Sequence, residues 1–173
     1  MSLPEYPYLP PGRAFKFVPA DHPCMQAAAT ACRERAGDAT FPVGIVLVRD
    51  GQVLARAGNG FDQGPQKHLC PRILAGCKTG EGYDLCHLHD IEGHSEPMLM
   101  RAAEQAGIPT EGADVYMYGH WWMCEPCWKT LIDHGIRDAY LVEDAHELFS
   151  KKNVYQRTLA DYPEDARRRL GLC

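Results

Sequence analysis

Residues 41–58 read FPVGIVLVRDGQVLARAG and contain the strongest β signal in the chain. Two apolar segments, 41–48 and 52–58, flank Asp50-Gly51, a pair that readily adopts the positive φ angles of a two-residue type I′ turn. The pattern therefore predicts a β-hairpin at this position.

Helix and strand signals alternate on both sides of this hairpin. Before it, Asp21 is a candidate N-cap for a helix over about 22–36, which Gly37 would end. After it we expect a helix at 96–106, a strand at 114–118, a helix at 125–134 and a strand at 137–142. This order predicts an α/β fold with a mixed sheet covered by helices. The last two strands should be parallel and joined by a right-handed crossover.

The two ends of the chain carry weaker signals. Five of the thirteen prolines fall in residues 1–20, so we expect an extended N-terminal arm with little helix or strand. Residues 21–150 would form the main domain, with a Cys/His-rich insertion at about 61–93. Residues 151–173 would form a C-terminal tail, and the sequence after Ala145 holds two short helical candidates.

Size and charge limit the classes of function. With 173 residues the chain is long enough for one domain with a sizeable core. Its 18 Lys and Arg against 23 Asp and Glu give a net charge of −5, which disfavours a general polynucleotide-binding surface. We find no apolar run long enough to span a bilayer and no secretory pattern at the start, so we expect a cytoplasmic protein.

The eight cysteines are unevenly distributed. Five of them lie between residues 70 and 127, close to five of the eight histidines. A reducing compartment disfavours structural disulfides and favours metal ligation or catalysis by such residues. Outside this block, we expect Cys24, Cys32 and Cys173 to be core or tail residues.

Two short motifs at predicted helix starts carry the chemistry: Gly93-His94-Ser95-Glu96 and Met123-Cys124-Glu125-Pro126-Cys127. Cys124 and Cys127 lie three residues apart on a first helical turn and can bind one ion as thiolates. His94 would supply a third ligand if the two helix starts meet at one edge of the sheet. Three protein ligands leave the fourth tetrahedral position open, as in catalytic zinc sites. Glu96 could then take a proton from water at the zinc.

His-x-Glu followed by Cys-x-x-Cys is the pattern of zinc deaminases. On these motifs, over about residues 40–142, the chain resembles the cytidine and deoxycytidylate deaminase superfamily. Gly58-Asn59-Gly60 after the hairpin and IDHGIRDAYLV at 132–142 are also similar. The resemblance implies a three-layer α/β/α cytidine-deaminase-like fold. It also implies a catalytic zinc held by the His and both Cys of the motifs, with the Glu as proton shuttle.

Within the superfamily the chain is most similar to deoxycytidylate deaminases, because a cysteine-containing insertion precedes its His-x-Glu helix. The implied reaction is hydrolysis of dCMP to dUMP and ammonia by a homo-oligomer, with a small-molecule nucleotide substrate and no polynucleotide or membrane partner. Two alternatives remain open. One is deamination of another free nucleobase, nucleoside or nucleotide, and the other is a non-catalytic, zinc-stabilised binding module on the same fold.

Three residues are candidates for substrate binding. The resemblance places Asn59 near the sugar or the base, although an Asn-Gly pair after a strand is also an ordinary turn. Trp122 would border the pocket, where a large aromatic ring can stack on a pyrimidine, and core packing is the alternative. Arg72 offers a guanidinium fork that matches a 5′-phosphate, with a surface salt bridge as the alternative.

The insertion also contains ligands for a second, structural zinc ion. Cys70, Cys77, Cys86 and one of His87 or His89 could supply four ligands in a long segment without apolar periodicity. We take His89 as the fourth ligand. Reduced, unpaired cysteines are the competing interpretation.

Overall fold

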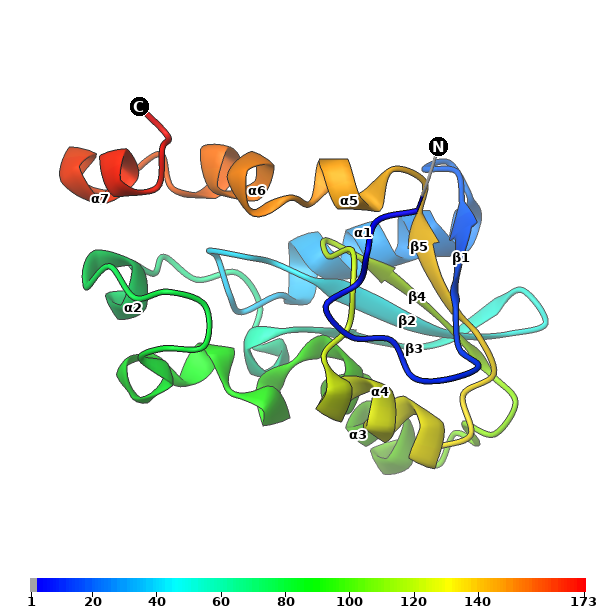
Figure 1. Ribbon diagram of the computed structural model, residues 1–173. Helices are drawn as coiled ribbons and strands as arrows, with labels where there is room; N and C mark the ends of the chain where they lie inside the picture. The colour runs from blue at the N-terminus through cyan, green and yellow to red at the C-terminus, as the bar shows by residue number, and fades with distance from the viewer. Residues whose placement is uncertain (1–2) are drawn as a thin grey trace.

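The predicted hairpin forms one side of a five-stranded sheet in the computed structural model, which describes residues 3–173 (Figure 1). Its strands are β2 (Gly44–Arg49) and β3 (Gln52–Gly58), which pair antiparallel. Asp50 and Gly51 have φ angles of 50° and 74°, as the predicted turn requires. The hairpin prediction is therefore confirmed.

The remaining strands make the sheet mixed, in the order β1-β5-β4-β2-β3. β4 (Asp114–Tyr118) pairs antiparallel with β2 and parallel with β5 (Ala139–Val142). The parallel pairing of β4 and β5 was predicted from the helix between them. Because β4 and β5 are parallel, their carboxyl ends lie side by side at one end of the sheet.

Helices cover both faces of the sheet (Figure 1). α1 (Pro23–Arg35) packs on one face, and α3 (Ser95–Gln105) and α4 (Glu125–Asp133) pack together on the other. The packing of α1 is close: a Cβ atom on Gly44 would lie 2.1 Å from the backbone nitrogen of Cys32. The α/β/α layering that the resemblance implied is confirmed.

The N-cap of α1 differs from the predicted one. His22, not Asp21, occupies the cap, and its Nδ1 accepts a hydrogen bond of 3.2 Å from the backbone N–H of Cys24. Pro23 follows at the first helical position, where its missing N–H costs nothing.

The N-terminal arm contributes a strand that the sequence analysis did not predict. β1 (Phe15–Val18) pairs parallel with β5, so the expectation of little strand in residues 1–20 is wrong at its end. The partner strand lies more than 120 residues further along the chain, and no local pattern indicates such a pairing. Phe15 is buried and packs on Trp128, with ring centroids 5.2 Å apart.

The insertion is mostly irregular. It holds α2 (Pro71–Leu74) and short 3₁₀ turns, namely η1 (Gly60–Asp62), η2 (Tyr83–Leu85), η3 (His87–His89) and η4 (Ile91–Gly93).

The tail forms three short helices where two were expected: α5 (Ala145–Leu148), α6 (Lys151–Thr158) and α7 (Glu164–Arg169). Figure 1 shows α6 and α7 running alongside the green insertion. A small buried cluster joins the two segments: Cys70, Cys86, Leu88, Leu159 and Tyr162. Within residues 3–173, no helix has the length and apolar character needed to cross a bilayer.

Candidate active site

Three side chains with metal-binding atoms meet where α3 and α4 begin. His94 and Cys124 are the N-cap residues of these helices, and Cys127 follows in the first turn of α4. His94 Nδ1 lies 3.3 Å from Cys127 Sγ and 3.7 Å from Cys124 Sγ. All three ligand atoms lie within 4.8 Å of one another. One imidazole and two thiols this close together fit a single zinc ion with one open position.

Among these three groups, the electrostatics favour the metal-binding form of Cys124, the thiolate. The adjacent Cys127 thiol lowers the pKa of Cys124 to about 4, while that of Cys127 is raised because the pair shares a proton. Burial lowers the pKa of His94, but Cys124 and Glu96 together bring it above its usual value. His94 Nε2 donates to the carbonyl of His89 at 3.3 Å, so Nδ1 is the ring atom that faces the sulfurs.

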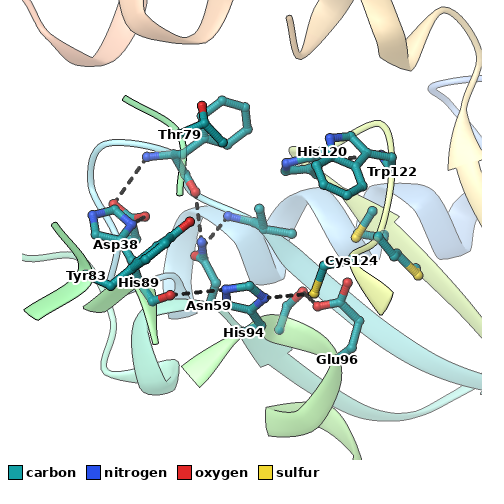
Figure 2. A pocket seen from close by; sticks show the side chains of 15 residues that line it. Asp38, Asn59, Thr79, Tyr83, His89, His94, Glu96, His120, Trp122 and Cys124 are labelled. Carbon is teal, nitrogen blue, oxygen red and sulfur yellow. Dashed lines mark hydrogen bonds and ion pairs between the residues drawn. The ribbon is translucent and has the colours of Figure 1, made fainter. Parts of the chain in front are cut away.

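Glu96 lies in the first turn of α3, next to this group of ligands (Figure 2). Only 5% of the residue is exposed, and Ser95 Oγ donates to its Oε2 at 2.9 Å. Burial raises the pKa of Glu96 above its usual value. A buried carboxyl group with a raised pKa holds a proton more readily than an exposed one, which suits a group that takes up and releases protons.

A cavity of about 270 Å³ opens over Glu96 and the two helix starts (Figure 2). Much of its wall is apolar and is formed by Phe41, Val43, Met117, Trp122 and Met123. Asp38, Asn59, Thr79, Tyr83, His89 and His120 also line it. No Lys or Arg belongs to the lining within the described part of the chain. The cavity has the size and the mainly apolar lining of a site for a small molecule.

Asn59, a predicted substrate-binding residue, lines this cavity. Its side chain also forms hydrogen bonds to the backbone of two other lining residues. Its Oδ1 accepts from the backbone N–H of Val43 at 3.0 Å, and its Nδ2 donates to the carbonyl of Phe41 at 2.8 Å. Each of these atoms has the capacity for one further hydrogen bond, which leaves Asn59 able to contact a ligand as well.

Trp122 lines the cavity as expected, and His120 lies next to it although the sequence analysis did not include His120 among the substrate-binding candidates. The centroids of the His120 and Trp122 rings are 5.6 Å apart, and the rings pack edge to face. His120 Nδ1 accepts the backbone N–H groups of Trp121 and Trp122, at 3.0 and 3.2 Å. Burial lowers the pKa of His120 to about 4, so the ring is neutral at pH 7 and carries its proton on Nε2.

Arg72 does not line the cavity but supports one of its walls. Its guanidinium group lies 4.3 Å from the ring centroid of Tyr83 and donates to the carbonyl of Glu81 at 2.8 Å. Lys151, from the tail, donates to Thr79 Oγ1 at 3.2 Å. Tyr83 and Thr79 both line the cavity, so two cations lie just behind its rim.

The four ligands predicted for the insertion are only partly brought together. Cys70 lies near both Cys86 and His89, whereas Cys77 lies elsewhere, with its sulfur beside Gly82. His68 joins Cys70 and Cys86 instead of Cys77, and His68 Nε2 lies 3.3 Å from Cys86 Sγ. The spacing of His68 and Cys70, two residues apart, was the available signal for it.

Comparison with known proteins gives one family match. Residues 19–143 match the family model described as "Cytidine and deoxycytidylate deaminase zinc-binding region". A curated relative, ComE operon protein 2 of Bacillus subtilis (strain 168), is 29% identical over 118 residues, which are 65% of this chain and 57% of the relative. The chain therefore spans less than two thirds of that relative's length.

Solved structures are also similar to this chain, among them two deaminases. The apo dCMP deaminase of cyanophage S-TIM5 is 18% identical and has a TM-score of 0.37, with 63% of this chain and 73% of that chain covered. A diaminohydroxyphosphoribosylaminopyrimidine deaminase/5-amino-6-(5-phosphoribosylamino)uracil reductase from Thermotoga maritima is 15% identical and has a TM-score of 0.43, with 84% and 38% covered.

Proposed function

The chain belongs to the cytidine and deoxycytidylate deaminase family, and on that premise we propose that it is a zinc-dependent hydrolytic deaminase of a cytosine nucleotide. The proposed reaction converts dCMP and water to dUMP and ammonia. One observation carries the proposal: the buried carboxyl group of Glu96 lies beside the His94, Cys124 and Cys127 cluster, at a cavity large enough for a pyrimidine.

Glu96 is the group that moves protons in the proposed reaction. His94, Cys124 and Cys127 would hold the zinc ion, which would supply the Lewis acidity that makes water nucleophilic at neutral pH. Glu96 accepts one proton from the water at its carboxylate and donates it to the ring nitrogen N3 as oxygen bonds to C4. It then passes the second water proton to the exocyclic amine. The C4–N bond breaks, ammonia leaves, and the ring becomes a uracil.

The cavity walls supply the contacts that would hold the base. Trp122 and Phe41 offer aromatic surface against which a pyrimidine ring can pack. The Nε2–H of the neutral His120 can donate to a ring carbonyl, and Asn59 can add a hydrogen bond to the sugar or the base. These groups recognise a flat ring with hydrogen-bonding edges.

A 5′-phosphate would lie at the rim, where the cations are. Arg72 and Lys151 stand behind Tyr83 and Thr79, and burial together with the nearby Arg72 lowers the pKa of Lys151. A dianionic phosphate between the two cations would relieve their mutual repulsion.

A second candidate function follows from the residues that line the cavity. Because the lining among residues 3–173 contains no Lys or Arg, an uncharged cytosine base or nucleoside would fill the same cavity without a charged partner. In that case the only role of Arg72 and Lys151 would be their contacts with Tyr83 and Thr79 at the rim of the cavity.

Ammonia release from a panel of compounds distinguishes the two candidates. We expect the zinc-loaded protein to deaminate dCMP with a higher kcat/KM than deoxycytidine, CMP, cytosine, AMP or guanine. A preference for deoxycytidine or cytosine over dCMP would support the second candidate. Protein that binds zinc but releases ammonia from none of these compounds would contradict both and would favour a non-catalytic binding module.

Two neighbouring lysines offer a matched test of the phosphate contact. Lys151→Ala should raise the KM for dCMP about tenfold, since a charged hydrogen bond is lost, and should leave the KM for deoxycytidine unchanged. Lys152 is exposed and makes no hydrogen bond or ion pair to the described rim residues, so Lys152→Ala should change neither value. Equal KM values for dCMP in the two variants would place the phosphate elsewhere.

A further inference from the structure

A second group of metal-binding side chains lies in the insertion, separate from the His94 cluster. His68 Nε2 is 3.3 Å from Cys86 Sγ, and His89 Nε2 is 3.1 Å from Cys70 Sγ. The ligand atoms of His68, Cys70 and Cys86 lie within 4.8 Å of one another. Two imidazoles and two thiols form the donor set of a closed, tetrahedral structural zinc site.

Apart from the small buried cluster that it shares with the tail, the insertion has little apolar packing. Its only α-helix has four residues, and its other regular elements are three-residue turns. Several of its large apolar side chains are exposed: Leu69, Leu74, Tyr83, Leu85 and Ile91. An irregular segment of this length within a folded domain needs another source of stability, and a bound metal can supply it.

One of the four ligands is held in place by a buried carboxylate. Asp38 Oδ2 lies 3.2 Å from His89 Nδ1, and only 3% of the Asp38 side chain is exposed. The other Asp38 oxygen accepts the backbone N–H groups of Thr40 and Phe41, at 2.8 and 3.2 Å. A carboxylate on Nδ1 orients the ring and leaves Nε2 free to bind a metal, as is usual for histidines that bind zinc.

His89 also contacts the catalytic cluster through its backbone. Its carbonyl accepts the Nε2–H of His94 at 3.3 Å, while His94 Nδ1 faces Cys127. The side chain of His89 therefore belongs to one cluster, and its carbonyl orients a ligand of the other. A change in the His89 backbone that accompanied the loss of its ring contacts would move the acceptor that holds His94.

We propose that His68, Cys70, Cys86 and His89 bind a second zinc ion, and that this ion positions His94 through the backbone of His89. Asp38 and His89 are then positioning residues for the catalytic centre. The first part of the proposal is independent of the proposed activity, and the second part rests on the zinc-binding role of His94.

Zinc content and zinc release test both parts without any substrate. We expect about two zinc ions per chain in the purified protein and about one in Cys86→Ser. The remaining ion of Cys86→Ser should pass to a chelator about 10- to 100-fold faster than the catalytic ion of the unaltered protein, because His94 has lost its support. Cys77→Ser is the matched control: it removes a cysteine of the same segment that lies outside the cluster, and both ions should stay.

Each possible result bears on one part of the proposal. If Cys86→Ser and Cys77→Ser contain equal zinc, the second site does not exist. If Cys86→Ser loses one ion but releases the other at the unaltered rate, the coupling to His94 is wrong. Two firmly bound ions without ammonia release from any compound would overturn the proposed function and leave the second site standing.

Asp38→Asn provides the test if Cys86→Ser does not fold. This variant keeps all four ligands and removes only the negative charge that orients His89. We expect it to retain both ions on purification and to release the second one about 10- to 100-fold faster than Cys77→Ser does. Equal release rates in these two variants would contradict the proposed role of Asp38 and His89.

Discussion

Glu96→Gln should reduce kcat by about 100- to 10,000-fold while leaving zinc content unchanged. The amide has the size of the carboxyl group and still accepts the hydrogen bond from Ser95, but it cannot carry a proton between water and substrate. The residue is buried, so no bulk water can easily take over the transfer. The measurement is steady-state ammonia release together with zinc per chain.

Glu92→Gln is the control for this variant, because Glu92 is an exposed carboxylate only four residues away. It should retain the kcat and the zinc content of the unaltered protein. Full turnover in Glu96→Gln would show that Glu96 does not move the protons. Loss of zinc from Glu96→Gln would instead assign Glu96 to holding the metal.

Cys124→Ser should remove the catalytic zinc ion and abolish turnover. A serine hydroxyl stays protonated at neutral pH, whereas the neighbouring Cys127 lowers the pKa of Cys124 to about 4 and so favours the thiolate that zinc requires. Two ligands are too few for a stable zinc site. Zinc per chain should fall by about one, as measured by metal analysis of the purified protein.

The matched control is Cys173→Ser, which changes the exposed C-terminal cysteine. This variant should keep its zinc and its activity. Equal zinc content in the two serine variants would exclude Cys124 as a ligand. If the second site in the insertion holds zinc, Cys124→Ser will still contain about one ion. The test is therefore the difference in zinc per chain between Cys173→Ser and Cys124→Ser.

The resemblance implied that His94 joins Cys124 and Cys127, and the residues alone predicted this only if the two helix starts meet. The sequence by itself was enough to predict the hairpin, the α/β class and the shared position of Cys124 and Cys127, and these three features depend on short-range rules. An Asp-Gly pair allows the turn of the hairpin, and alternating helices and strands build a layered sheet. Residues three apart at a helix start share one face, which brings Cys124 and Cys127 together.

Tertiary structure alone decided the features that depend on distant partners. β1 forms because β5 offers it a parallel edge, a pairing between segments more than 120 residues apart. His68 rather than Cys77 joins Cys86, because the path of an irregular segment has no period that a sequence pattern could reveal. The pairing of Asp38 with His89 likewise arises from folding, since close packing brings together side chains whose separation along the chain carries no signal.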